Sequence, residues 1–330
     1  MPVVTDFTEL QAACQVSGTV QVANDITLSD FITIPNTADI TLESLSGQAT
    51  IFAPSTIHFY VLGDGTQGGG GSLTLQNITL DGNHTYGGIH IGYTNLNQIA
   101  GGTLILNAGS IVQNCYQLNN FYAGNGTIGM RGGILEMHDG AIIQNNEVGQ
   151  GAGGGIDLEH AVGTTVYSKM TMTGGLITRN KAATSGGGIN VTQGATCLMS
   201  GGTISYNAGM YGAGVNIDAN ISHSTFTMNT DTGSSIITHN HATAFGGGVG
   251  LNPYLDGGEA TFNFQAGEIS FNAADLAGGG IGSALRKDQT DNDGILMVNQ
   301  TGGTIAHNTA PLGGGVFIST LDESEIPSIT

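Results

Sequence analysis

The stretch from Leu176 to Val191, LITRNKAATSGGGINV, decides the fold. It joins an Ile, an Asn three residues later and a triple glycine to a short alternating strand. Seven further copies of this pattern, some degenerate, follow one another along the chain at spacings of 27 to 36 residues. The repeated asparagines are Asn83, Asn114, Asn145, Asn180, Asn207, Asn240, Asn272 and Asn308. A repeat of this length predicts a solenoid, in which each copy packs on its neighbours.

Each repeat from Ser72 onward contains three strand-like pieces, exemplified by Met170/Met172, the run at Ile177, and Ile189/Val191. Side chains at i and i+2 share one face of a strand, so every repeat offers three short inward faces. The sequence therefore predicts an all-β, right-handed parallel β-helix of about ten rungs. We expect the repeated Asn to form an inward ladder. The glycine triplets should occupy corners that need positive φ and close backbone approach.

The pattern predicts a single domain, residues 1–330. Asp6 and Glu9 have capping-box spacing, which predicts a helix over about residues 6–15 within an N-terminal cap, 1–18. Residues 19–71 are predicted to form compact early rungs and 72–319 the long-rung repeats. We interpret 320–330 as a tail that continues in a longer parent protein.

The composition excludes several classes of function. The net charge is −19, with only six Lys and Arg, so no basic patch is present to bind nucleic acid. No apolar run reaches the ~18 residues that cross a bilayer, so we expect no membrane insertion of this segment. Three cysteines without a CxxC motif indicate neither a disulfide framework nor a zinc site.

The repeats over residues 80–318 resemble those of bacterial surface adhesin-like β-helix proteins. They are similar to the paired F-x-x-N and G-G-A-I motifs of chlamydial polymorphic outer membrane proteins. Phe271-Asn272 and Gly279-Gly280-Ile281 are the nearest matches, with Ile usually in place of Phe and Gly in place of Ala. The opening, DFTELQAAC…TVQVANDITL, resembles the cap and first rungs of secreted pectin-lyase-like proteins. The resemblance implies an extracellular, cell-surface location as part of a larger secreted protein.

The first candidate surface is the outward row of the third strand. Arg131 is expected one rung from Asp157 and Glu159. A basic residue beside two carboxylates is what a polysaccharide lyase or glycoside hydrolase needs. An ion pair on a solvated polar face is the alternative interpretation. The same row supplies three candidate binding residues, Asn190, Asn216 and Asp218.

The second candidate surface is the residue before each repeated Asn. It includes Gln113, Gln144 and Arg179, and then Tyr206, His239, Phe271 and His307. Large side chains at a corner should form an outward column, and aromatic rows can stack on sugars. These residues either contact a glycan or only cover the adjacent turn.

The third candidate surface is the loop Lys287-Asp-Gln-Thr-Asp-Asn-Asp-Gly294, in which Asp288, Asp291 and Asp293 could hold Ca²⁺. Such clusters are also ordinary turn sequences. No other cofactor is expected.

Three functions are consistent with these patterns. The leading hypothesis is a non-catalytic, extracellular, adhesin-like module that binds glycans or host and partner surface proteins through its outward columns and loops. The alternatives are a polysaccharide lyase or glycoside hydrolase acting in the groove of the third strand, and a passive surface stalk. The scarcity of basic residues and the regular rungs favour the adhesin-like module over the enzyme.

Overall fold

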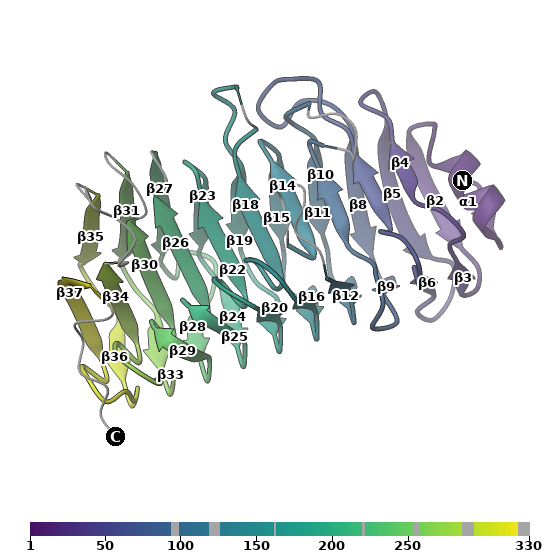
Figure 1. The fold of residues 1–330 in the computed structure, drawn as a ribbon. Coiled ribbons are helices and arrows are strands. Elements are labelled where there is room, and N and C mark those ends of the chain that lie inside the picture. The colour runs from purple at the N-terminus through teal and green to yellow at the C-terminus, as the bar shows by residue number, and fades with distance from the viewer. Residues whose placement is uncertain are drawn as a thin grey trace.

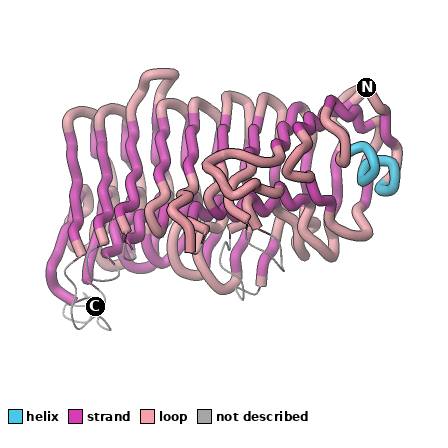
Figure 2. The backbone as a smooth tube through the Cα atoms, turned by 90° about the horizontal axis from the view of Figure 1, so that it is seen from above, coloured by secondary structure: helices cyan, strands magenta, loops and turns pink. Residues whose placement is uncertain are grey.

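The described residues form a rod of stacked strands with one short helix at its N-terminal end (Figures 1 and 2). This computed structural model describes residues 1–93, 99–118, 126–161, 163–219, 222–253, 258–285 and 294–322. It confirms the all-β, right-handed parallel β-helix. Among the described residues, no helix has the length and apolar character needed to cross a membrane.

Three long sheets run the length of the rod and a fourth, short one follows a corner. The first sheet comprises β1 (Val3–Val4), β2 (Gly18–Val22), β5 (Asp39–Ser44), β8 (Ser72–Gln76), β11 (Thr103–Leu106), β15 (Ile134–Met137), β19 (Lys169–Met172), β23 (Thr196–Met199), β27 (His223–Met228), β31 (Glu259–Phe264) and β35 (Ile295–Gln300). The second sheet comprises β3 (Ile26–Thr27), β6 (Thr50–Phe52), β9 (Thr79–Asp81), β12 (Ile111–Gln113), β16 (Ile142–Gln144), β20 (Leu176–Thr178), β24 (Gly202–Ser205), β28 (Ser235–Thr238), β32 (Glu268–Ser270) and β36 (Thr304–Ala306). The third sheet comprises β4 (Ile32–Ile34), β7 (Phe59–Val61), β10 (Ile89–Ile91), β14 (Ile128–Arg131), β18 (Ile156–Glu159), β22 (Ile189–Thr192), β26 (Val215–Ala219), β30 (Val249–Pro253), β34 (Ile281–Leu285) and β37 (Val316–Asp322). The corner sheet comprises β13 (Tyr116–Gln117), β17 (Glu147–Val148), β21 (Lys181–Ala182), β25 (Ala208–Tyr211), β29 (His241–Phe245) and β33 (Ala273–Ala274).

The long repeat makes about eight turns, where the sequence predicts about ten rungs in all. Two compact sets of strands, β2-β3-β4 and β5-β6-β7, precede it and extend the same sheets. Neighbouring strands pair in parallel with like residues opposite one another, as Met172 lies opposite Met137 and Met199. The corner sheet was not expected, because its strands are too short to show an alternating pattern.

The inward faces fill one continuous core. Met137, Met172, Met199 and Met228 form a column with no exposed surface, as expected for gap-filling core side chains. All three cysteines are buried, and burial raises the pKa of the Cys14 and Cys197 thiols to about 12.

The inward asparagine ladder exists but begins at a different residue from the one predicted. Successive side chains are joined by amide hydrogen bonds of 2.9 to 3.1 Å from Nδ2 to Oδ1. The ladder runs through Asn146, Asn180, Asn207, Asn240, Asn272 and Asn308.

The predicted positions Asn83, Asn114 and Asn145 lie outside this ladder. At Asn114 and Asn145 the predicted register was wrong by one residue, whereas Asn83 follows the inward Leu80 by three residues, as predicted, but is exposed. Gln144 lies opposite Thr178, which places Asn145 beside Arg179 rather than Asn180. The cause is a pair of adjacent branched residues, Ile142-Ile143, of which only Ile143 is fully buried. Choosing the wrong member of such a pair shifts every side chain to the opposite face.

The glycine triplets occupy the expected corners. The first glycine of a triplet has positive φ, as Gly186 does at +63°. The next two are held against a neighbouring turn, and a Cβ on Gly187 would lie 2.3 Å from the carbonyl oxygen of Ala208. Only glycine allows that approach without displacing the backbone.

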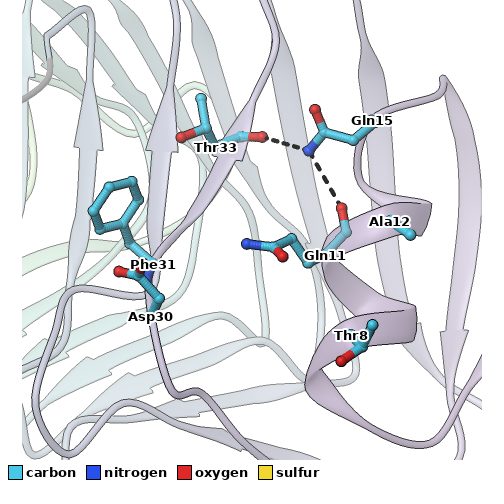
Figure 3. Close-up of a pocket in the computed structure, with 7 residues that line it drawn as sticks. All are labelled: Thr8, Gln11, Ala12, Gln15, Asp30, Phe31 and Thr33. Atoms are coloured by element: carbon cyan, nitrogen blue, oxygen red, sulfur yellow. Dashed lines mark hydrogen bonds between the residues drawn. The ribbon is translucent and has the colours of Figure 1, made fainter.

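The N-terminal cap is helix α1 (Phe7–Ala13), close to the predicted range. Asp6 accepts a hydrogen bond from the Glu9 amide at 3.0 Å, as a capping residue does. Leu10 is fully buried against the first rungs. An open groove of about 480 Å³ remains beside the helix (Figure 3), lined by Thr8, Gln11, Ala12, Gln15, Asp30, Phe31 and Thr33. The Gln15 side-chain amide donates a hydrogen bond across the groove to the Thr33 carbonyl at 3.1 Å, which links the cap to strand β4 of the third sheet.

Candidate functional site

Arg131 and the two carboxylates are brought together but are buried. Arg131 is 1% exposed, Asp157 1% and Glu159 7%. Arg131 lies opposite Glu159 in neighbouring strands of the third sheet, with Nη2 3.4 Å from Oε2. The three side chains are therefore neighbours, as predicted, but the prediction that their row faces solvent was wrong.

Two aromatic side chains, Tyr93 and His90, pack beside this ion pair. The Arg131 guanidinium lies 5.3 Å from the centroid of the Tyr93 ring, and that ring stacks on His90 at 4.7 Å. Burial, together with the nearby Arg131 charge, lowers the pKa of His90 to about 3, so His90 is neutral at physiological pH. Tyr93 could not be assigned to this cluster from sequence, because it lies beyond the alternating run that ends at Ile91.

Asp157 belongs to a second, outward-facing ladder. Its Oδ1 accepts a hydrogen bond from Asn190 Nδ2 at 2.8 Å, and Asn190 Oδ1 accepts one from Asn216 Nδ2 at 2.7 Å. Asn252 donates in turn to Asn216 Oδ1. Asn190 and Asn216 are 4% and 0% exposed. These two candidate binding residues therefore hydrogen-bond to each other beneath the surface. Asp218, on the neighbouring row, is partly exposed.

The column beside the asparagine ladder is exposed. We call its last five members the ring strip, and they are Arg179, Tyr206, His239, Phe271 and His307. In the earlier turns the predicted members of this column, Gln113 and Gln144, are wrong by one residue. They pair with Asp81 and Thr178 in the second sheet, and Asn114 and Asn145 occupy the column instead. The four sequence-predicted residues Tyr206 to His307 are thus brought together, and Arg179 joins them.

The members of the ring strip stack on one another along the rod. Arg179 lies 5.5 Å from the Tyr206 ring. The successive ring centroids from Tyr206 to His307 are 4.9, 5.3 and 4.9 Å apart, with interplanar angles of 14° to 23°. Tyr206 and Phe271 remain 52% and 51% exposed. Because each ring covers the face of the next, the strip presents ring edges to solvent.

The backbone beneath the strip adopts an uncommon conformation. All five residues have φ of 55° or 56°, in the left-handed region that costs a residue with a side chain about 1–2 kcal/mol. Asparagine tolerates this conformation best after glycine, and Asn114 and Asn145 occupy it in the earlier turns at φ of 54° and 56°. Bulky side chains in the later turns are therefore not required by the corner itself. Stacking, at about 0.5–1.5 kcal/mol per pair, offsets part of the strain.

The Ca²⁺ candidates Asp288, Asp291 and Asp293 lie outside the described residues. Within the described part of the chain, no group of three or more His, Cys, Asp or Glu side chains could hold a metal ion.

Comparison with known proteins finds no match to this chain. No protein-family model matches it, and neither a curated protein nor a solved structure does.

Proposed function

We propose that this chain is a non-catalytic, extracellular, adhesin-like module that binds a glycan or a partner protein through the ring strip. One observation carries the proposal: five exposed side chains stack in a single row on strained backbone. Exposed aromatic and arginine side chains in a contiguous patch are typical of binding surfaces.

The earlier turns provide the comparison within the molecule. Asn114 and Asn145 show that the same corner forms without a ring. The rings of the later turns therefore add an exposed surface at a cost in backbone strain, which is more readily explained by binding than by folding. The resemblance of the repeats to surface adhesins supports the extracellular location.

The burial of Arg131, Asp157 and Glu159 disfavours the enzymatic alternative. A general acid or base must come within hydrogen-bond reach of the sugar it acts on. Asp157 is bonded to the asparagine ladder and Arg131 is paired with Glu159. This cluster is better explained as structural.

The test is binding to an immobilised panel of plant, algal and host polysaccharides and surface proteins. The test variant is Tyr206→Asn/Phe271→Asn, because asparagine retains the left-handed corner. Tyr86→Asn is the matched control, since Tyr86 is also 52% exposed but lies outside the strip. We expect at least about tenfold weaker binding by the double variant, or ~1.4 kcal/mol, and no change in the control.

Far-UV circular dichroism must show both variants folded. Equal binding by the double variant would overturn the assignment to the strip. A blank panel for the folded wild-type chain would overturn the binding function and leave the passive stalk.

A further inference from the structure

Cationic and aromatic side chains alternate along the ring strip. Arg179, His239 and His307 are separated from one another by Tyr206 and Phe271. Resting on the binding function proposed above, we propose that the ligand is a linear polyanionic glycan, bound more tightly once the two histidines are protonated.

The stacking accommodates those charges. Each imidazole lies 4.9 to 5.3 Å from a neighbouring aromatic ring, within the range of a cation–π contact. Successive cationic positions are two rungs apart, roughly 10 Å at the ~4.8 Å strand spacing, which is about one Debye length at physiological salt. Protonation therefore creates a row of three positive charges with little mutual repulsion.

The rest of the molecule makes this row distinctive. The chain carries a net charge of −19, so an anionic ligand is repelled elsewhere. Arg179 is exposed and makes no ion pair with any described residue. Lys181 lies at the same corner and is paired with Glu147 at 2.8 Å.

Among the residues that the structure describes, few titratable groups lie beside the two histidines. His239 Nδ1 lies 2.9 Å from the Thr238 hydroxyl, and the rings of Tyr206 and Phe271 flank it. Nearby, the corner sheet carries His241, whose Nε2 lies 2.8 Å from Asp275. Glu268 begins β32, next to the strands that precede both histidines, and β36 before His307 carries no charged residue.

The geometry favours a charged polymer over a neutral sugar. Neutral sugars stack on ring faces, and here the neighbouring rings cover the faces. The exposed edges instead offer imidazole N–H groups and a guanidinium, which are donors to carboxylate or sulfate. A straight row at uniform spacing matches a polymer whose charged units repeat uniformly, as a polysaccharide's do.

The experiment compares two linear polymers with the same backbone, carboxymethyl-cellulose and hydroxyethyl-cellulose, with poly-glutamate as the acidic peptide. Affinities are measured at about pH 5.5 and about pH 8.0 at fixed ionic strength, because histidine changes charge within that interval. We expect carboxymethyl-cellulose to bind at least roughly fivefold more tightly at the lower pH, and the neutral polymer to bind weakly at both.

The test variant is His239→Asn/His307→Asn and the control is His84→Asn. His84 is exposed and has φ of 58°, so its replacement matches the chemistry and backbone of the test outside the strip. The double variant should lose the pH dependence, and the control should keep it.

The outcomes separate this inference from the binding function. Strip-dependent binding that does not change with pH, or that is as tight for hydroxyethyl-cellulose, would overturn the inference and leave the function standing. Preference for poly-glutamate would assign the strip to an acidic protein instead. Strip-independent binding, or none to any polymer or panel member, would overturn both.

Discussion

Asn146→Ala should lower the free energy of unfolding strongly and Asn145→Gly hardly at all, although the two residues are adjacent. Asn146 is 1% exposed, and its side chain makes three hydrogen bonds. Its Nδ2 donates to the Val112 carbonyl at 3.2 Å and to Asn180 Oδ1 at 2.9 Å, and its Oδ1 accepts from the Cys115 amide at 2.9 Å. At about 1 kcal/mol for each bond, Asn146→Ala should lower the free energy of unfolding by about 3 kcal/mol.

Asn145 is exposed and has φ of 56°, which glycine adopts without strain. Asn145→Gly should therefore change the free energy of unfolding by less than about 0.5 kcal/mol. The assay is urea denaturation followed by far-UV circular dichroism and by tyrosine fluorescence, whose transitions must coincide for the comparison to hold. A loss of stability in Asn145→Gly as large as that in Asn146→Ala would refute the ladder register described here.

Two further predictions concern buried charge. Arg131→Ala should remove the cation that pairs with buried Glu159 and lower the free energy of unfolding by about 3 kcal/mol, while ligand binding per folded molecule is unchanged. Urea denaturation and the polysaccharide panel check both halves, and a stable variant that loses binding would contradict the structural role. Burial lowers the pKa of His58 from 6.5 to about 4, so between those values the unfolded chain binds a proton that the folded chain does not. The free energy of unfolding should fall by as much as about 3 kcal/mol as pH falls from 6.5 to 4, and His58→Gln should flatten that dependence in urea titrations at successive pH values.

Much of the fold could be predicted from the sequence, because the repeat places like residues at like positions. The inward rows of leucine, isoleucine and methionine follow directly from period-two alternation and are buried as expected. The choice of inward residue was wrong at Ile111-Val112 and Ile142-Ile143, because either of two adjacent branched residues could face the core. The hydrogen bonds of Asn146 resolve the choice, since an inward amide must find partners.

The candidate sites show the same division. Alternation correctly placed Arg131 opposite Glu159, and the repeated Asn correctly aligned Tyr206 with His239, Phe271 and His307. Whether a residue that points away from the core is exposed could not be predicted. Asn190 and Asn216 point outward yet are buried in their own ladder.

The sequence by itself determined the architecture, the direction of the core rows and the scarcity of positive charge, because these depend on residue type and spacing alone. Only the tertiary structure decided which outward residues reach solvent and which ring faces remain free. Those properties depend on what the next turn of the rod places against each side chain, and that neighbour lies about thirty residues away in the chain.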